Sequence, residues 1–182
     1  SAAEPNPAGA DFAAEHGIAY YKTMREAIAH EGVEAVILAT PHSLHAEQIK
    51  MAAAAKKHIF CEKPLALTRK GAEAAVNLAK KHKLVLGMGH ERRWEPPVAR
   101  MLELARSGAL GRIQQVEGNF SHDKFTTLDP KNWRLNKSEA PVGGMTATGI
   151  HLTDLAVALL GAAKDLRVSC EKLSSKIPQG DT

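Results

Sequence analysis

A chain of 182 residues is long enough for one large domain or for parts of two. Its hydrophobic content of 44% and charged content of 24% are ordinary for a globular protein, and aromatic residues at 4% are too few for a base-stacking surface. The net charge of +4 is concentrated in short lysine clusters near the ends of predicted helices, where cations complement the helix dipole. These numbers exclude a nucleic-acid partner from our expectations.

Compartment and membrane signals are sparse. The longest apolar runs fall well short of the roughly 20 residues that span a bilayer, so no membrane partner is expected. Cys61 and Cys170 follow no metal or redox spacing, and Cys61 lies in an apolar run typical of a small buried hydrophobe. We therefore expect no metal site and a reducing, cytoplasmic location. The start at Ser1 resembles a cut into a longer chain, so a targeting signal would lie upstream.

Short apolar runs alternate with helical stretches in the first half of the chain. The runs are apolar on both faces, as strands of a helix-covered parallel sheet are. The expected strands are 33–40, 58–61 and 84–89; the expected helices are 44–57 and 69–83, the second with Thr68 as its N-cap. This alternation predicts an α/β fold with a doubly wound parallel sheet of the Rossmann kind.

The pattern changes after Trp94. We expect a helix at 97–107, a strand at 113–120, a helix within 145–160 that ends at Gly161, and a strand at 166–173. This half therefore predicts the start of an α+β domain with an open, mostly antiparallel sheet.

Polar residues follow the apolar runs at 40–42, 62–64 and 89–90. Ligands of open α/β sheets collect at the carboxyl ends of the strands, so these residues form the first candidate site. Glu62 and Lys63 are the most informative pair, since burial disfavours the charged form of an amine and makes a lysine able to accept a proton. A surface Glu–Lys pair at a strand end is the alternative.

Four segments occur in a distinctive order: 40–45 (TPHSLH), 61–64 (CEKP), 89–96 (GHERRWEP) and 143–154, which runs from a glycine pair to His151 and Asp154. Together they resemble the Gfo/Idh/MocA oxidoreductases, the family of glucose-fructose oxidoreductase and inositol dehydrogenase. The resemblance implies an incomplete NAD(P)-binding Rossmann domain over 1–94. It also implies an incomplete substrate and oligomerisation domain over 95–182, and a homo-oligomeric parent protein.

The resemblance also assigns cofactor residues. Lys63 matches the catalytic lysine of the family, and Glu62 matches its neighbour near the nicotinamide ribose. Thr40 and Pro41 match the loop beside the cofactor, and His45 matches the start of the helix that follows. The implied cofactor is NAD, with NADP as the alternative.

Glu4 matches the acidic residue after the family's second strand. A carboxylate there would accept hydrogen bonds from the adenosine ribose and repel a 2′-phosphate, which favours NAD over NADP. The alternative is an acid in an ordinary turn, since prolines and an asparagine surround it.

His151 matches the active-site histidine of the family. Oxidation of a carbinol needs a base for the hydroxyl proton, and Lys63 and His151, expected in different domains, could share that proton. A buried helix histidine bonded to a carbonyl is the alternative. Asp154 lies one helical turn further on the same face, where it could orient the imidazole or contact substrate.

Arg93, Trp133 and Arg134 match further family motifs near the substrate cleft. Arg134 could hold a substrate hydroxyl or carboxylate, and Trp133 could wall the pocket. A surface ion pair is an equally good interpretation of Arg134, and a domain-interface anchor is an equally good interpretation of Trp133.

The sequence departs from the family in two places. It contains no G-x-G-x-x-G, the loop whose backbone N–H groups hold the pyrophosphate. We therefore hypothesise that residues 1–182 alone bind NAD poorly, lack activity and expose an unpaired strand edge. Ala147 stands where the family often has an aspartate, one turn before His151.

The leading hypothesis is an NAD(P)-dependent dehydrogenase that transfers hydride between nicotinamide and a hydroxyl carbon of a sugar, polyol or related compound. Two alternatives stay open: a non-catalytic nucleotide-binding regulator, which Ala147 permits, and a glycosidase that uses NAD in a transient oxidation.

Overall fold

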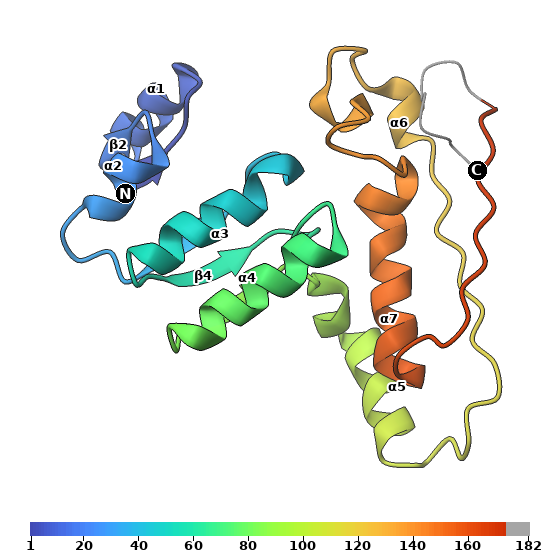
Figure 1. Cartoon of the computed structure of the whole chain (residues 1–182). Helices are drawn as coiled ribbons and strands as arrows, with labels where there is room; N and C mark the ends of the chain where they lie inside the picture. The colour runs from blue at the N-terminus through green and yellow to red at the C-terminus, as the bar shows by residue number, and fades with distance from the viewer. Residues whose placement is uncertain (174–182) are drawn as a thin grey trace. The chain divides into compact units, whose positions relative to one another are not determined.

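The structure, a computed structural model, describes residues 1–173, and the chain divides into two compact units, Ser1–Gly89 and His90–Thr182. Each unit has its own arrangement of elements (Figure 1). The predicted domains, 1–94 and 95–182, stay a prediction, and residues 174–182 of the second lie outside the described residues.

The first unit is built on a three-stranded parallel sheet in the order β3 (Ala35–Leu38), β4 (His58–Cys61) and β5 (Leu86–Met88). Cys61 is the register partner of both Leu38 and Met88, so the three strands end level with one another. The predicted parallel sheet is therefore confirmed, and its three carboxyl ends lie in one row.

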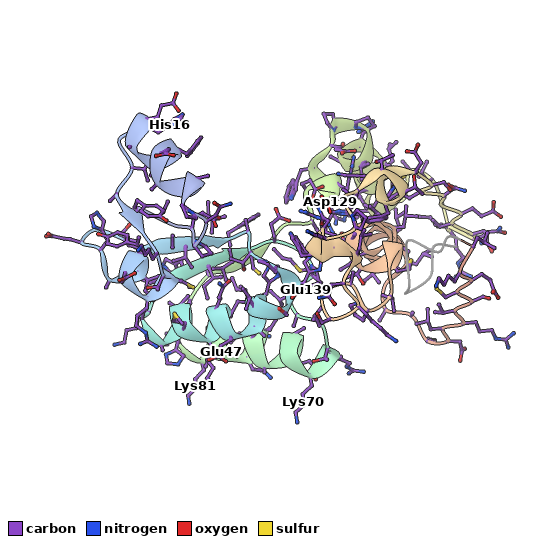
Figure 2. The ribbon with its side chains drawn as sticks, turned by 90° about the horizontal axis from the view of Figure 1, so that it is seen from above. His16, Glu47, Lys70, Lys81, Asp129 and Glu139 are labelled. Carbon is purple, nitrogen blue, oxygen red and sulfur yellow. The ribbon has the colours of Figure 1, made fainter. Side chains whose placement is uncertain are left out.

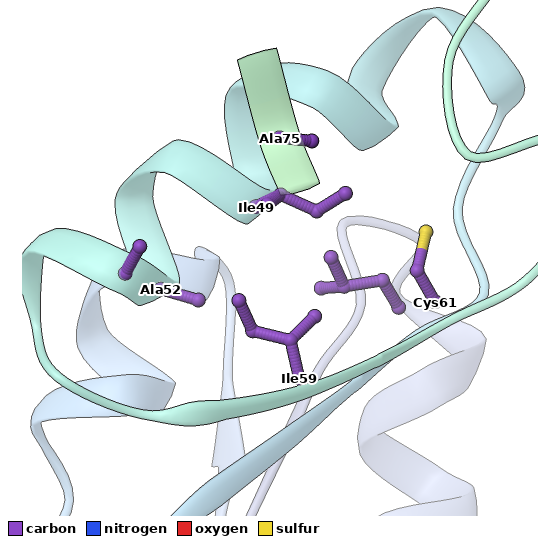
Figure 3. Packing of buried hydrophobic residues seen from close by; sticks show 7 residues of the cluster. Ile49, Ala52, Ile59, Cys61 and Ala75 are labelled. Carbon is purple, nitrogen blue, oxygen red and sulfur yellow. The ribbon is translucent and has the colours of Figure 1, made fainter. Parts of the chain in front are cut away.

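Helices α3 (His45–Ala54) and α4 (Arg69–Lys81) supply the core of the first unit. Ile49, Ala52 and Ala75 from the helices pack against Ile59 and Cys61 from β4, and all five are buried (Figure 3). These residues form a small apolar cluster between the two helices and the sheet, and the removal of its apolar surface from water stabilises the first unit.

The other face of the sheet is open in this chain. Ile37 on β3 is 77% exposed and its register partner Phe60 on β4 is 43% exposed. Among the described residues β3 pairs only with β4, so it forms an edge of this sheet. The hypothesis of an exposed strand edge agrees with this arrangement.

Short elements precede this sheet, and the sequence analysis did not predict them. Strand β1 (Ala2–Ala3) pairs in parallel with β2 (Tyr20–Tyr21), and two helices, α1 (Ala8–Glu15) and α2 (Met24–Ala29), pack on them. A capping box begins α2: Glu26 N–H donates to Thr23 Oγ1, and Thr23 N–H donates to the Glu26 carboxylate.

The predicted helices of the first unit are confirmed with shorter bounds. A single turn of tighter helix, η1 (His42–Leu44), precedes α3. The Thr68 hydroxyl accepts a hydrogen bond from Gly71 N–H at 3.1 Å, so Thr68 is the N-cap of α4 as predicted.

The regular elements of the second unit are all helices over its described residues. Its elements are η2 (Glu91–Trp94), α5 (Pro96–Arg106), α6 (Lys124–Thr127), η3 (Trp133–Leu135), η4 (Met145–Gly149) and α7 (Ile150–Leu160). Helix η4 is a π-helix that leads directly into α7, and Gly161, at φ 85°, ends α7. The predicted helices at 97–107 and 145–160 are confirmed.

The strands expected at 113–120 and 166–173 were wrong for the described residues. The structure assigns neither segment to a strand, although both carry exposed apolar side chains such as Val116, Leu166 and Val168. A strand exists only through hydrogen bonds to a partner strand, and apolar, β-branched composition alone does not supply that partner. Within residues 1–173 no helix is long and apolar enough to cross a membrane.

Candidate active site

The row of strand ends in the first unit carries the predicted cofactor residues. Beyond the regular strands, Glu62 N–H donates to Leu38 O at 2.8 Å and Gly89 N–H donates to Cys61 O at 2.9 Å. These two bonds hold Glu62 beside the end of β3 and Gly89 beside the end of β4. The sheet therefore delivers Glu62 and Lys63 to one edge, as the sequence predicted.

His45 links the two loops that leave β3 and β4. Its side chain is completely buried, with Nδ1 2.7 Å from Pro64 O and Nε2 2.9 Å from Thr40 O. Carbonyl oxygens only accept, so a neutral imidazole donates to one of them and a protonated imidazole to both. His45 therefore fixes the separation of the Thr40–Pro41 and Lys63–Pro64 segments.

The carboxylate of Glu62 lies against Gly89. A Cβ placed on Gly89 would stand 2.9 Å from Glu62 Oε2, which is too close for a real contact. The same oxygen accepts a hydrogen bond from Lys63 N–H at 3.3 Å. The absence of a side chain at residue 89 thus lets the carboxylate fold back over the strand ends.

Lys63 is half-buried at this edge, between buried Cys61 and buried Pro64. Burial, together with the smaller effect of the neighbouring Glu62 charge, raises the pKa of the Cys61 thiol to about 12. Cys61 is therefore a neutral, buried part of the core, as predicted, and the roles of Lys63 and Glu62 at this edge stay predictions.

Thr40 and Pro41, both half-buried, complete the edge. The Thr40 hydroxyl donates to Gln48 Oε1 at 2.5 Å, and Gln48 lies on α3 one turn beyond His45. Sequence reasoning missed Gln48, although its spacing from His45 on the helix is a signal that could have found it.

Glu4 is exposed and follows β1 directly. Its Oε1 accepts the Asn6 N–H at 2.8 Å, and its carbonyl accepts the Tyr20 hydroxyl at 2.7 Å. A Cβ on Gly9 would stand 2.5 Å from Glu4 Cγ, so the first turn of α1 packs directly on this side chain. These contacts match the alternative interpretation, in which Glu4 is an acid in an ordinary turn. Its role toward a ribose stays a prediction.

The second unit contains a cluster around His151. The imidazole is 7% exposed, and its Nε2 lies 3.7 Å from Glu91 Oε1. The ring of His90 meets it edge to face, with ring centroids 5.9 Å apart. Glu91 was not among the predicted residues, although it lies within the 89–96 motif, and His90 was predicted only as part of the polar segment 89–90.

Arg93 and Asp154, both predicted to bind substrate, bind each other. Arg93 Nε lies 2.6 Å from Asp154 Oδ2, and Arg93 Nη2 lies 2.5 Å from Asp154 Oδ1. The hydrogen bond to Asp154 raises the pKa of the Arg93 guanidinium. This two-point clamp joins η2 to α7, and His90 Nε2 lies 3.6 Å from the same carboxylate.

Trp133 and Arg134 lie together on η3. The Arg134 guanidinium stacks on the Trp133 ring at 4.3 Å, and Arg134 N–H donates to Asn132 Oδ1. Their substrate role stays a prediction.

Within residues 1–173 no group of three or more His, Cys, Asp or Glu side chains is arranged to hold a metal ion.

Both units match sequence models of one enzyme family. Residues 2–90 match the oxidoreductase family with an NAD-binding Rossmann fold, and residues 98–182 match the Gfo/Idh/MocA C-terminal domain. The chain belongs to the Gfo/Idh/MocA oxidoreductase family.

Named relatives of the chain include sugar enzymes. It is 33% identical to the 1,5-anhydro-D-fructose reductase of Ensifer adhaerens over 80% of the chain and 44% of that enzyme. A levoglucosan dehydrogenase solved with NADH and levoglucosan is 33% identical, with a TM-score of 0.73, covering 87% of the chain and 44% of that structure. A putative NADPH-dependent oxidoreductase from Desulfitobacterium hafniense is 30% identical, with a TM-score of 0.77, covering 87% and 46%. The chain thus spans less than half the length of each.

The strand-end residues fit a nicotinamide cofactor. The Glu62 carboxylate occupies the space that a Cβ on Gly89 would fill, and it is an acceptor suited to ribose hydroxyls. The family is NAD(P)-dependent. Among these residues, Thr40, Pro41 and Glu62 would hold the nicotinamide half with Lys63 beside it, and His45 would act by fixing their loops.

Proposed function

We propose that the complete protein, meaning the product of the full coding sequence, is an NAD(P)-dependent dehydrogenase that oxidises a secondary hydroxyl of a cyclic sugar or polyol. The observation that carries this proposal is the placement of Glu62 and Lys63 at the carboxyl end of β4, beside Thr40, with His45 bonded to both loops. The sugar enzymes among the relatives support the substrate class.

A nicotinamide held by these residues would supply the hydride acceptor for the carbinol carbon. The O–H bond breaks as the C=O bond forms, so the proton must pass to a protein base. We assign that proton to the Lys63 amine, which lies half-buried at the strand ends beside Glu62.

We assign His151 as the second proton-handling group. Its buried ring can donate a hydrogen bond to a hydroxyl or carbonyl oxygen. NAD is the expected cofactor through Glu4, with NADP as the alternative. Homo-oligomeric assembly and a cytoplasmic location stay predictions.

The test is a panel of cyclic polyols and aldoses offered to the complete protein with NAD or NADP, followed by the absorbance of reduced nicotinamide. We expect reduction with at least one pyranose or cyclitol. Nucleotide binding without reduction on any member of the panel would favour the regulatory alternative. Glycosidic cleavage that requires NAD but leaves no net reduced cofactor would favour the glycosidase.

A further inference from the structure

A base that takes up a proton works best when a nearby carboxylate fixes its ring and stabilises the cation formed. Three positions near His151 are considered for this carboxylate: residue 147, which is an alanine one turn earlier, Asp154 one turn later, and Glu91 on η2. The structure distinguishes them.

The side chain of Ala147 is a methyl group, so this position, one turn before His151, supplies no carboxylate. That turn is the π-helix η4, and its Thr148 hydroxyl donates to Gly144 O at 2.8 Å. His122 Nε2 lies 3.4 Å from Thr148 Oγ1, so Thr148 is engaged with its own segment and with His122.

Asp154 is engaged elsewhere. Both of its oxygens bind Arg93, and its side chain is only 10% exposed. His90 Nε2 also lies 3.6 Å from Asp154 Oδ1. Asp154 therefore serves the clamp that holds η2 on α7.

Glu91 is on the clamped turn, two residues before Arg93, and its Oε1 lies 3.7 Å from His151 Nε2. Arg92 Nε lies 3.7 Å from the same oxygen and keeps a positive charge beside it. The Glu91 side chain is 60% exposed, so solvent can reach the carboxylate while the imidazole stays buried.

We propose that Glu91 is the positioning residue of His151, supplying across η2 the carboxylate that Ala147 does not. This inference rests on the proposed function, in which His151 handles a proton. Glu91 from η2 and His90 from its N-cap face the imidazole, Arg92 lies beside Glu91, and Arg93 and Asp154 bind each other.

The test uses the complete protein and four variants: Glu91→Gln, Glu91→Asp, Glu91→Gln with Ala147→Asp, and Glu103→Gln. Glu103 is a matched control because it is an exposed acid of the same unit, paired with Arg100 at 2.8 Å. We expect Glu91→Gln to lower kcat about tenfold or more with KM nearly unchanged, since general base catalysis contributes about 10²–10⁴-fold.

Rescue separates positioning from folding. Glu91→Asp should recover part of the kcat lost in Glu91→Gln. Ala147→Asp should also recover part of it, by placing a carboxylate one turn before His151. Glu103→Gln should match the unsubstituted protein.

A kcat of Glu91→Gln within twofold of the unsubstituted protein would overturn the inference while leaving the proposed function standing. A loss of kcat that neither Glu91→Asp nor Ala147→Asp relieves would also overturn it, because Glu91 would then be needed for folding rather than for positioning His151. An unsubstituted protein that reduces no cofactor with any polyol would overturn the proposed function itself, and this inference with it.

Discussion

Glu62 Oε2 lies so close to Gly89 that a Cβ at residue 89 would stand 2.9 Å from it. The observed position of the Glu62 carboxylate therefore requires a glycine at residue 89. We predict that Gly89→Ala displaces the carboxylate and lowers the nicotinamide affinity of the complete protein. The cost in unfolding free energy should stay near 1 kcal/mol, because the end of a flexible side chain can move.

The matched control for this prediction is Gly87→Ala, whose Cβ would approach Phe60 Cδ2 at 3.1 Å instead. Isothermal calorimetry with NADH and thermal unfolding would separate the two variants. Equal affinity for both would contradict a cofactor role for Glu62.

His45→Ala should destabilise the first unit by about 2–4 kcal/mol. The substitution removes a fully buried ring and leaves the carbonyls of Thr40 and Pro64 without their shared partner. Urea unfolding of residues 1–182 measures this, with exposed His82→Ala as the control. If both variants unfold at the same urea concentration, His45 does not link the loops.

Cys61 should resist modification. Its thiol pKa lies near 12, so almost no thiolate exists at pH 8, whereas exposed Cys170 is accessible. A thiol reagent should label one cysteine per folded chain and two after denaturation. Rapid labelling of Cys61 in the folded chain would show that this core opens.

The same thiol predicts a pH dependence of stability. Since the pKa is raised in the folded state, from 9.0 to about 12, the folded chain holds the proton more tightly than the unfolded chain. The contribution of this pKa shift to the free energy of unfolding is fully present below pH 9 and is lost as the pH rises toward 12. Cys61→Ala should flatten this part of the stability profile.

Asp154→Asn should destabilise the second unit by about 2–3 kcal/mol, since it leaves Arg93 without the charge that both of its donors bind. The partial exposure of Arg93 keeps the effect below that of a fully buried pair. The exposed Arg100–Glu103 pair provides the comparison, and Glu103→Gln should cost about 0.5 kcal/mol or less.

Local signals predicted much of the first unit and less of the second. The apolar run at 58–61 matches β4, and Thr68 begins α4, because both depend on neighbouring residues. The Thr23–Glu26 capping box was available as a signal for α2 and was missed. The segment 113–120 has strand composition, but pairing is set by distant residues that composition does not reveal.

The candidate site divides in the same way. The order of motifs led to Lys63 and His151, whereas the contacts of His45, Glu91 and Asp154 depend on how loops and helices pack. The π-helix that leads into the helix of His151 was also not predicted from the sequence.

The central claim is that Lys63 takes part in proton transfer rather than in cofactor binding. The most direct measurement compares Lys63→Ala with Lys70→Ala in the complete protein; Lys70 is an exposed lysine of α4 (Figure 2). We predict that Lys63→Ala lowers kcat by about 10²-fold or more while the NADH dissociation constant changes little, and that Lys70→Ala changes neither. Turnover that persists in Lys63→Ala would contradict the account.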